Sequence, residues 1–95
     1  NAIAQCNLAI CYQNGQGVKQ DYVKAFEWYT KAADQGNAFA QSYLGDCYKN
    51  GQGVKQDYVK AVEWFSKAAE QGNADAQVFL GDFFYNGRGV KQDYI

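Results

Sequence analysis

Apolar residues recur every three or four positions along two segments of a 36-residue unit, which predicts two amphipathic helices per unit. In the first segment of the central unit, Ala40, Leu44 and Tyr48 form a stripe at four-residue spacing. The second segment carries a longer stripe with polar residues on the opposite side, and its members are Tyr58, Ala61, Val62, Phe65, Ala68 and Ala69. A single helix pair with two such stripes needs a neighbouring pair to cover them.

Polar and glycine residues mark the ends of both segments. Asn37 and Asp57 stand at the two starts, where their side-chain oxygens can accept hydrogen bonds from the free amides of a first turn. Asn50-Gly51 and Gly72 stand at the two ends, and glycine tolerates the left-handed conformation that often terminates a helix. The unit is therefore predicted to be helix, loop, helix, with the sequence QGVKQ in the loop.

The unit repeats along the whole chain. GQGVKQDY at residues 15–22 recurs at 51–58 and returns as GRGVKQDY at 87–94. The first two units differ at ten of their 36 positions. We predict an all-α fold, an α-solenoid of antiparallel helix pairs, that forms one domain. Its predicted parts are repeat one at 1–36, repeat two at 37–72 and a partial repeat three at 73–95.

A set of positions carries a family resemblance. In the central unit these are Ala40, Leu44-Gly45, Tyr48, Gly51-Gln52-Gly53-Val54, Asp57, Lys60-Ala61, Trp64, Lys67-Ala68-Ala69 and Gly72. The pattern resembles the Sel1-like repeat, a relative of the tetratricopeptide repeat. The tetratricopeptide period is shorter and usually closes its second helix near a proline, whereas this chain has no proline and carries a G-x-G-V loop. The resemblance implies a right-handed superhelix whose first helices line a concave surface, and it implies a module that binds proteins.

Charge and composition exclude several function classes. The 95 residues carry 9 Lys and Arg against 10 Asp and Glu, so there is no basic excess to neutralise the phosphates of nucleic acid or of an anionic membrane. Histidine is absent, which removes the commonest general base and the commonest zinc ligand. The longest apolar run, Leu8 to Tyr12, is far too short to span a membrane. We expect no enzyme activity, no cofactor, no nucleic acid partner and no membrane insertion.

Two repeated motifs have structural explanations. The G-x-G loops lack the third glycine of a dinucleotide fingerprint and follow no predicted strand, so we interpret them as loops between helices. Asp21, Asp57 and Asp93 occur once per unit before a second helix, which is typical of a helix cap rather than a metal site.

The tryptophans and cysteines are also interpreted as packing residues. Trp28 and Trp64 recur at equivalent positions, so we expect both indoles in the interface between units. Cys11 and Cys47 are equivalent, and their third counterpart is Phe83, which predicts buried thiols without a redox function.

The differences among units concentrate on one side of the first helix. At about 100° per residue, repeat positions 3, 6, 10, 13 and 14 fall within one arc of about 100°. Four of these five positions differ between the first two units. By the resemblance, this arc faces the concave groove, where we expect a partner peptide. The candidate binding residues are Ile3, Cys6, Ile10, Gln13 and Asn14 in unit one, Phe39, Ser42, Asp46, Lys49 and Asn50 in unit two, and Asp75, Val78, Asp82, Tyr85 and Asn86 in unit three.

Within this set, the expected anchors are Phe39 and Tyr85, and the charged residues set the polarity of the peptide. The three asparagines, Asn14, Asn50 and Asn86, leave two interpretations open. Their amides could hold a peptide backbone, or they could cap the helix beside the following glycine.

An alternative function is that of a slice of a longer solenoid, which self-associates through its open ends. Leu80 and Phe84 lack the covering stripe of a second helix, and Phe79, Phe83 and Tyr85 are expected to add to the exposed apolar area. This alternative predicts a homo-oligomer formed through the C-terminal end. The chain begins with Asn rather than Met, so we expect an N-terminal targeting segment to be absent from it. A cytoplasmic protein and one from an exported bacterial compartment both fit the sequence.

Overall fold

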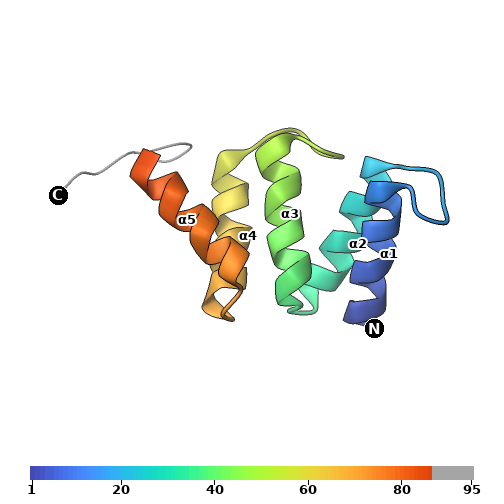
Figure 1. The fold of residues 1–95 in the computed structure, drawn as a ribbon, viewed down its shortest axis with the longest axis horizontal. Coiled ribbons are helices and arrows are strands. Elements are labelled where there is room, and N and C mark those ends of the chain that lie inside the picture. The colour runs from blue at the N-terminus through green and yellow to red at the C-terminus, as the bar shows by residue number, and fades with distance from the viewer. Residues whose placement is uncertain (87–95) are drawn as a thin grey trace.

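The computed structural model describes residues 1–86, and this part of the chain forms five α-helices of 13 residues each. They are α1 (Ala2–Asn14), α2 (Tyr22–Asp34), α3 (Ala38–Asn50), α4 (Tyr58–Glu70) and α5 (Ala74–Asn86). The helices stand side by side in chain order, with α1 and α5 at opposite ends of the row (Figure 1). The predicted all-α solenoid of antiparallel helix pairs is confirmed. The third copy of the loop motif, with Asp93, lies outside the described residues.

The helices begin and end where the sequence places their caps. Asn37 Oδ1 accepts a hydrogen bond of 2.8 Å from Ala40 N, and Asp57 Oδ1 accepts one of 3.1 Å from Lys60 N. Gly51 ends α3 with a φ of 68°, and its N–H donates to Cys47 O. Asp21 caps α2 in the same way, at 3.1 Å from Lys24 N. The predicted capping role of Asp21 and Asp57 is therefore confirmed, because each carboxylate accepts a hydrogen bond from the first turn of its own helix.

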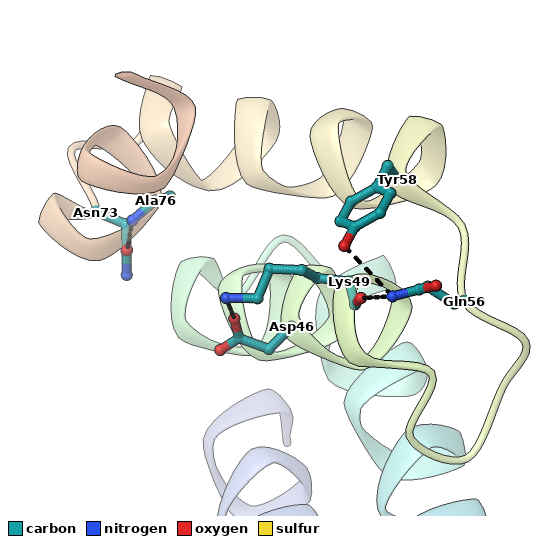
Figure 2. A network of polar contacts seen from close by, with 6 residues as sticks. All are labelled: Asp46, Lys49, Gln56, Tyr58, Asn73 and Ala76. Atoms are coloured by element: carbon teal, nitrogen blue, oxygen red, sulfur yellow. Dashed lines mark hydrogen bonds and ion pairs between the residues drawn. The ribbon is translucent and has the colours of Figure 1, made fainter. Parts of the chain in front are cut away.

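Both G-x-G loops within residues 1–86 are closed by the glutamine that stands where a nucleotide-binding loop would need glycine. Gln56 Nε2 donates 2.8 Å to Lys49 O at the end of α3, as Figure 2 shows, and Gln20 Nε2 donates 2.7 Å to Gln13 O. The amide groups thus satisfy carbonyls that the helix end leaves free. These contacts support the structural interpretation of the loops.

The core consists of two clusters in which small residues bring the helices close together. Cys6, Ala9, Ala25, Tyr29, Ala32, Ala33, Ala40, Leu44 and Cys47 form the first cluster, and Ala61, Phe65, Ala68 and Ala76 form the second. Across each boundary between units one aromatic pair stacks: Tyr29 on Tyr43 at 5.2 Å and Phe65 on Phe79 at 4.0 Å between ring centroids. The apolar stripes of each helix pair predicted that the next unit would cover them, and these contacts do so.

A ladder of glutamines also joins the units. Gln41 is only 5% exposed, and its amide donates 3.3 Å to Ala33 O at the end of α2. Its oxygen accepts a 2.8 Å hydrogen bond from Gln71 Nε2. Gln77 repeats the first contact with Ala69 O at 3.1 Å. Because both ends of the buried Gln41 amide are used, burial costs it no unsatisfied polar atom.

Two expectations about aromatic residues need revision. Phe83 is 3% exposed and lies against the rings of Tyr58 and Phe79, so the prediction that it adds to the exposed apolar area is wrong. Its position, equivalent to Cys47, faces the core in both units. Trp28 and Trp64 contact the first core cluster but are only half-buried, and the ammonium groups of the nearby lysines, Lys31 and Lys67, lie over their rings at 4.3 and 4.4 Å.

Candidate functional site

A pocket of about 410 Å³ lies between α1 and α3. It is lined mainly by apolar side chains, and we call it the apolar pocket; its lining residues are Ile3, Cys6, Asn7, Ile10, Asn37, Phe39 and Tyr43. Four of the predicted binding residues, from two different units, therefore meet around one cavity. Ile3 and Phe39 are each 66% exposed, which is unusual for side chains of this size.

A second pocket, of about 360 Å³, is also lined by Phe39. Its lining is more polar, and we call it the polar pocket; its lining residues are Ala38, Phe39, Gln71, Gly72, Asn73, Ala74 and Asp75. Phe39 is the residue that the two pockets share. We call the two pockets together the two-pocket groove.

Three charged residues lie where α3 faces α5. Lys49 Nζ is 3.6 Å from Asp46 Oδ1, as Figure 2 shows, and 5.1 Å from the centre of the Phe79 ring. Burial raises the pKa of the Asp46 carboxyl above its usual value, Lys49 lowers it, and the negative charge of Asp75 adds to the rise. The charged form of Asp46 is thus less favourable here than in water, although a lysine stands beside it.

The change from Gln13 in unit one to Lys49 in unit two is explained by a hydrogen bond inside the protein. The buried Tyr29 hydroxyl donates to Gln13 Oε1, and burial raises the pKa of that hydroxyl, so it stays protonated as a donor. In the next unit Phe65 stands at the position of Tyr29 and has no hydroxyl to satisfy. Lys49, at the position of Gln13, turns instead to Asp46. The sequence contained this signal, because the Tyr-to-Phe change accompanies the Gln-to-Lys change between the first two units.

The structure places the other predicted binding residues in three settings. Cys6 and Ser42 are 5% and 7% exposed, so their side chains lie in the core and offer little surface. Asn14 and Asn50 are exposed, and within residues 1–86 their side chains make no hydrogen bond, so capping by these amides is not observed. The α5 residues Val78, Asp82 and Tyr85 are exposed, and Asn86 is the last residue of that helix. Phe84 is 52% exposed, and self-association through this end stays a prediction.

The structure also bears on cofactor and membrane sites. Among residues 1–86, no three Cys, Asp or Glu side chains gather as metal ligands would. In the same part of the chain, every helix is too short or too polar to cross a bilayer.

Cys47 is expected to be protected from thiol reagents by the fold. It is 4% exposed, and burial together with the charge of Asp46 raises the pKa of its thiol from 9.0 to about 12. In a variant that keeps only Cys47, labelling at pH 8 should be at least about tenfold slower in native than in urea-unfolded protein. The unfolded thiol ionises first as the pH rises, so the stability of the fold should also decrease above about pH 9.

A variant that keeps only Cys11, which occupies the equivalent but half-buried position, is the control. It should show a smaller difference between native and unfolded rates. Native labelling of Cys47 at the unfolded rate would contradict its placement in the core.

Comparison with known proteins identifies the family to which the repeat belongs. The sequence profile of the Sel1 repeat matches residues 2–37, 38–73 and 74–95. A Sel1 repeat protein from Oxalobacter formigenes is 40% identical with a TM-score of 0.95, over 99% of this chain and 39% of that one. A protective antigen present in uropathogenic Escherichia coli strains, displaying an SLR fold, is 46% identical with a TM-score of 0.94, over 98% and 20%.

Cysteine-rich protein B of Helicobacter pylori is more distant, at 32% identity and a TM-score of 0.78, over 82% of this chain and 59% of that one. No functionally curated protein matches the sequence. The chain thus spans less than two thirds of each of these three structures. Because the profile matches three times in register from residue 2 to residue 95, the chain belongs to the Sel1 repeat family.

Proposed function

We propose that this chain is a protein-interaction module that holds an extended segment of a partner protein in the two-pocket groove. Sel1 repeat proteins are in general protein-interaction modules, and the family is a structural scaffold that is not typically enzymatic. The observation that carries the proposal is the exposure of Ile3 and Phe39 around the apolar pocket. Large apolar side chains clustered at a cavity are typical of interaction sites.

Other exposed apolar residues support the groove less well. Val23 and Val59 are 54% and 52% exposed on α2 and α4. They are identical at equivalent positions, as expected for a surface that every unit shares, and neither lines a pocket described above. Ile3 and Phe39 differ between units and line the same cavity. Because the residues that line this cavity vary between units, the groove is the surface best suited to select one partner over another.

The proposal predicts a binding loss on truncation of Phe39. Peptides selected from a random dodecapeptide phage library by the immobilised parent chain should bind Phe39→Ala about 30-fold more weakly, since an aromatic anchor contributes about 2 kcal/mol or more. Fluorescence anisotropy with labelled copies of the selected peptides measures the loss. Phe39 is exposed, so the thermal midpoint of Phe39→Ala should stay within about 2 °C of the parent value.

The matched control is Val59→Ala, which truncates another exposed apolar side chain, on the second helix of the same unit. It should leave the affinity unchanged. Peptides that bind Phe39→Ala as tightly as the parent, or that lose affinity only with Val59→Ala, would show that the groove is not the binding surface.

A further inference from the structure

Two positions of the repeat change from apolar to acidic along the groove. The residues are Ile3, Phe39 and Asp75 at one position, and Ile10, Asp46 and Asp82 at the other. None of the six side chains is buried in the core, because each is exposed or half-buried. Ile10 packs partly against the first core cluster, and the Asp46 carboxylate forms an ion pair with Lys49, so internal contacts account in part for these two residues. In residues 1–86, no hydrogen bond or ion pair accounts for Asp75 or Asp82.

The acidic end of the groove carries more negative than positive charge. In residues 1–86 the ion pairs are limited to Asp46 with Lys49, at 3.6 Å, which is longer than a direct hydrogen bond. Asp75 lies close enough for its charge to act on Asp46, so two carboxylates lie near the ammonium group of Lys49. Asp82 lies further along the same helix as Asp75.

The helix dipole explains only part of this charge. Asp75 lies in the first turn of α5, where the positive end of a helix stabilises a carboxylate. Asp46 and Asp82 lie well beyond the first turns of α3 and α5, where the dipole gives them no such support. Asp46 is also half-buried, and burial disfavours the charged form of its carboxyl group. A carboxylate held at such a position, beside a second one, is well placed to receive a cation from outside.

We infer that the partner segment carries an apolar side chain and, about three residues away, a lysine or arginine. The apolar side chain enters the apolar pocket beside Phe39, and the cationic group lies between Asp46 and Asp75, where it competes with the long contact of Lys49. This inference rests on the proposed function, and it adds the chemistry of the partner. Opposite charge across such a surface fixes the register of the segment and speeds its association.

The spacing follows from the repeat. A segment that runs from the pocket between α1 and α3 to the carboxylates between α3 and α5 crosses one helix, α3. A helix with its side chains is about 10–12 Å wide and an extended chain advances about 3.3 Å per residue, so the crossing needs about three residues.

The test uses the sequences that the parent chain selects from the random dodecapeptide library. They should be enriched in an aliphatic or aromatic residue with Lys or Arg about three positions away. The double variant Asp46→Asn and Asp75→Asn should still select the apolar residue but lose the preference for Lys or Arg. A peptide chosen by the parent should bind this variant about five- to tenfold more weakly at physiological salt.

A second double variant, Glu63→Gln and Glu70→Gln, removes the same charge from the exposed side of α4 and is the control. It should select the same peptides as the parent and bind them equally well. Asp46→Asn removes a charge that burial disfavours, and Asp75→Asn removes one that the α5 dipole favours, so the thermal midpoint of the groove variant should stay within about 2 °C of the parent value.

The possible results separate the two proposals. Peptides that depend on Phe39 but show no preference for Lys or Arg, or prefer Asp and Glu, would overturn the inference and leave the proposed function standing. A preference for Lys or Arg that the α4 control also loses would show a general charge effect and overturn the inference. Selection of no peptide that depends on Phe39 would overturn both.

Discussion

Gly53→Ala is expected to lower the free energy of unfolding by about 3 kcal/mol or more, whereas Gly17→Ala at the equivalent position should lower it by about 1–2 kcal/mol. Both glycines have a positive φ, 76° and 74°, so an alanine is strained at either position. At Gly53, however, a Cβ atom would also lie 2.2 Å from Tyr22 O and 2.8 Å from Tyr22 C. These are backbone atoms at the start of α2, and they cannot turn away. At Gly17 a Cβ atom would meet nothing within 4 Å.

Urea denaturation of the two variants and the parent measures the difference. Because both substitutions carry a similar φ strain, the excess at Gly53 reports the contact between the loop after α3 and the preceding helix pair. Equal losses in the two variants would show that this loop does not rest on α2. The midpoint of Gly53→Ala should fall while the slope of the transition stays the same, since the same surface becomes exposed on unfolding.

The helices themselves were predictable because their signals are local. Asn37 and Asp57 mark helix starts through hydrogen bonds that span three residues, and Gly51 ends α3 through its own φ. A 36-residue repetition then predicts that the same interface recurs. These inferences need no knowledge of distant contacts, which is why the bounds of α3 agree with the expected ones.

The contacts between units were not predictable in the same way. Gly17 and Gly53 lie in identical GQGVKQDY motifs, yet a Cβ atom at Gly53 would meet the preceding helix pair and one at Gly17 would meet nothing within 4 Å. Cys6 and Ser42 fall on the expected groove arc of a helical wheel, but the structure buries both. A wheel gives the direction of a side chain and does not give the position of the neighbouring helix.

The candidate site stays a prediction. The arc grouped Ile3, Ile10 and Phe39, and these three residues line one pocket in the structure. On the same arc, the change from Gln13 to Lys49 suggested a contact with a ligand. The structure explains that change by the hydrogen bond between Tyr29 and Gln13, which has no counterpart at Phe65. Differences between units therefore indicate a binding surface only after internal compensation has been removed.

The main packing residue of α4 is Phe65 rather than its neighbour Trp64. Phe65 is 2% exposed and is stacked on Phe79, whereas Trp64 is half-buried with Lys67 over its ring. Phe65→Ala is therefore expected to cost about 3–5 kcal/mol, and Trp64→Ala should cost clearly less. This reverses the emphasis that the recurrence of tryptophan suggested.

Gly45→Ala should change the sign of its effect according to whether Phe65 is present. A Cβ atom on Gly45 would lie 2.8 to 2.9 Å from three atoms of the Phe65 ring. Phe79 stacks on that ring at 4.0 Å between centroids, which limits how far it can move. In the parent, crowding should lower the free energy of unfolding by about 1–3 kcal/mol. In the Phe65→Leu background the planar ring is gone, and the helix propensity of alanine should raise stability by up to about 1 kcal/mol.

A double-mutant cycle with these two substitutions, measured by urea denaturation, should therefore give a coupling energy of about 1–4 kcal/mol. Gly81 occupies the same repeat position in α5, and a Cβ atom there would meet nothing within 4 Å. Gly81→Ala should accordingly be neutral or stabilising in both backgrounds. Phe65→Leu keeps much of the buried apolar volume, so the cycle remains measurable in a domain of this size. Additive effects at Gly45 and Phe65 would contradict the close approach of α4 to α3 that forms one wall of the second core cluster.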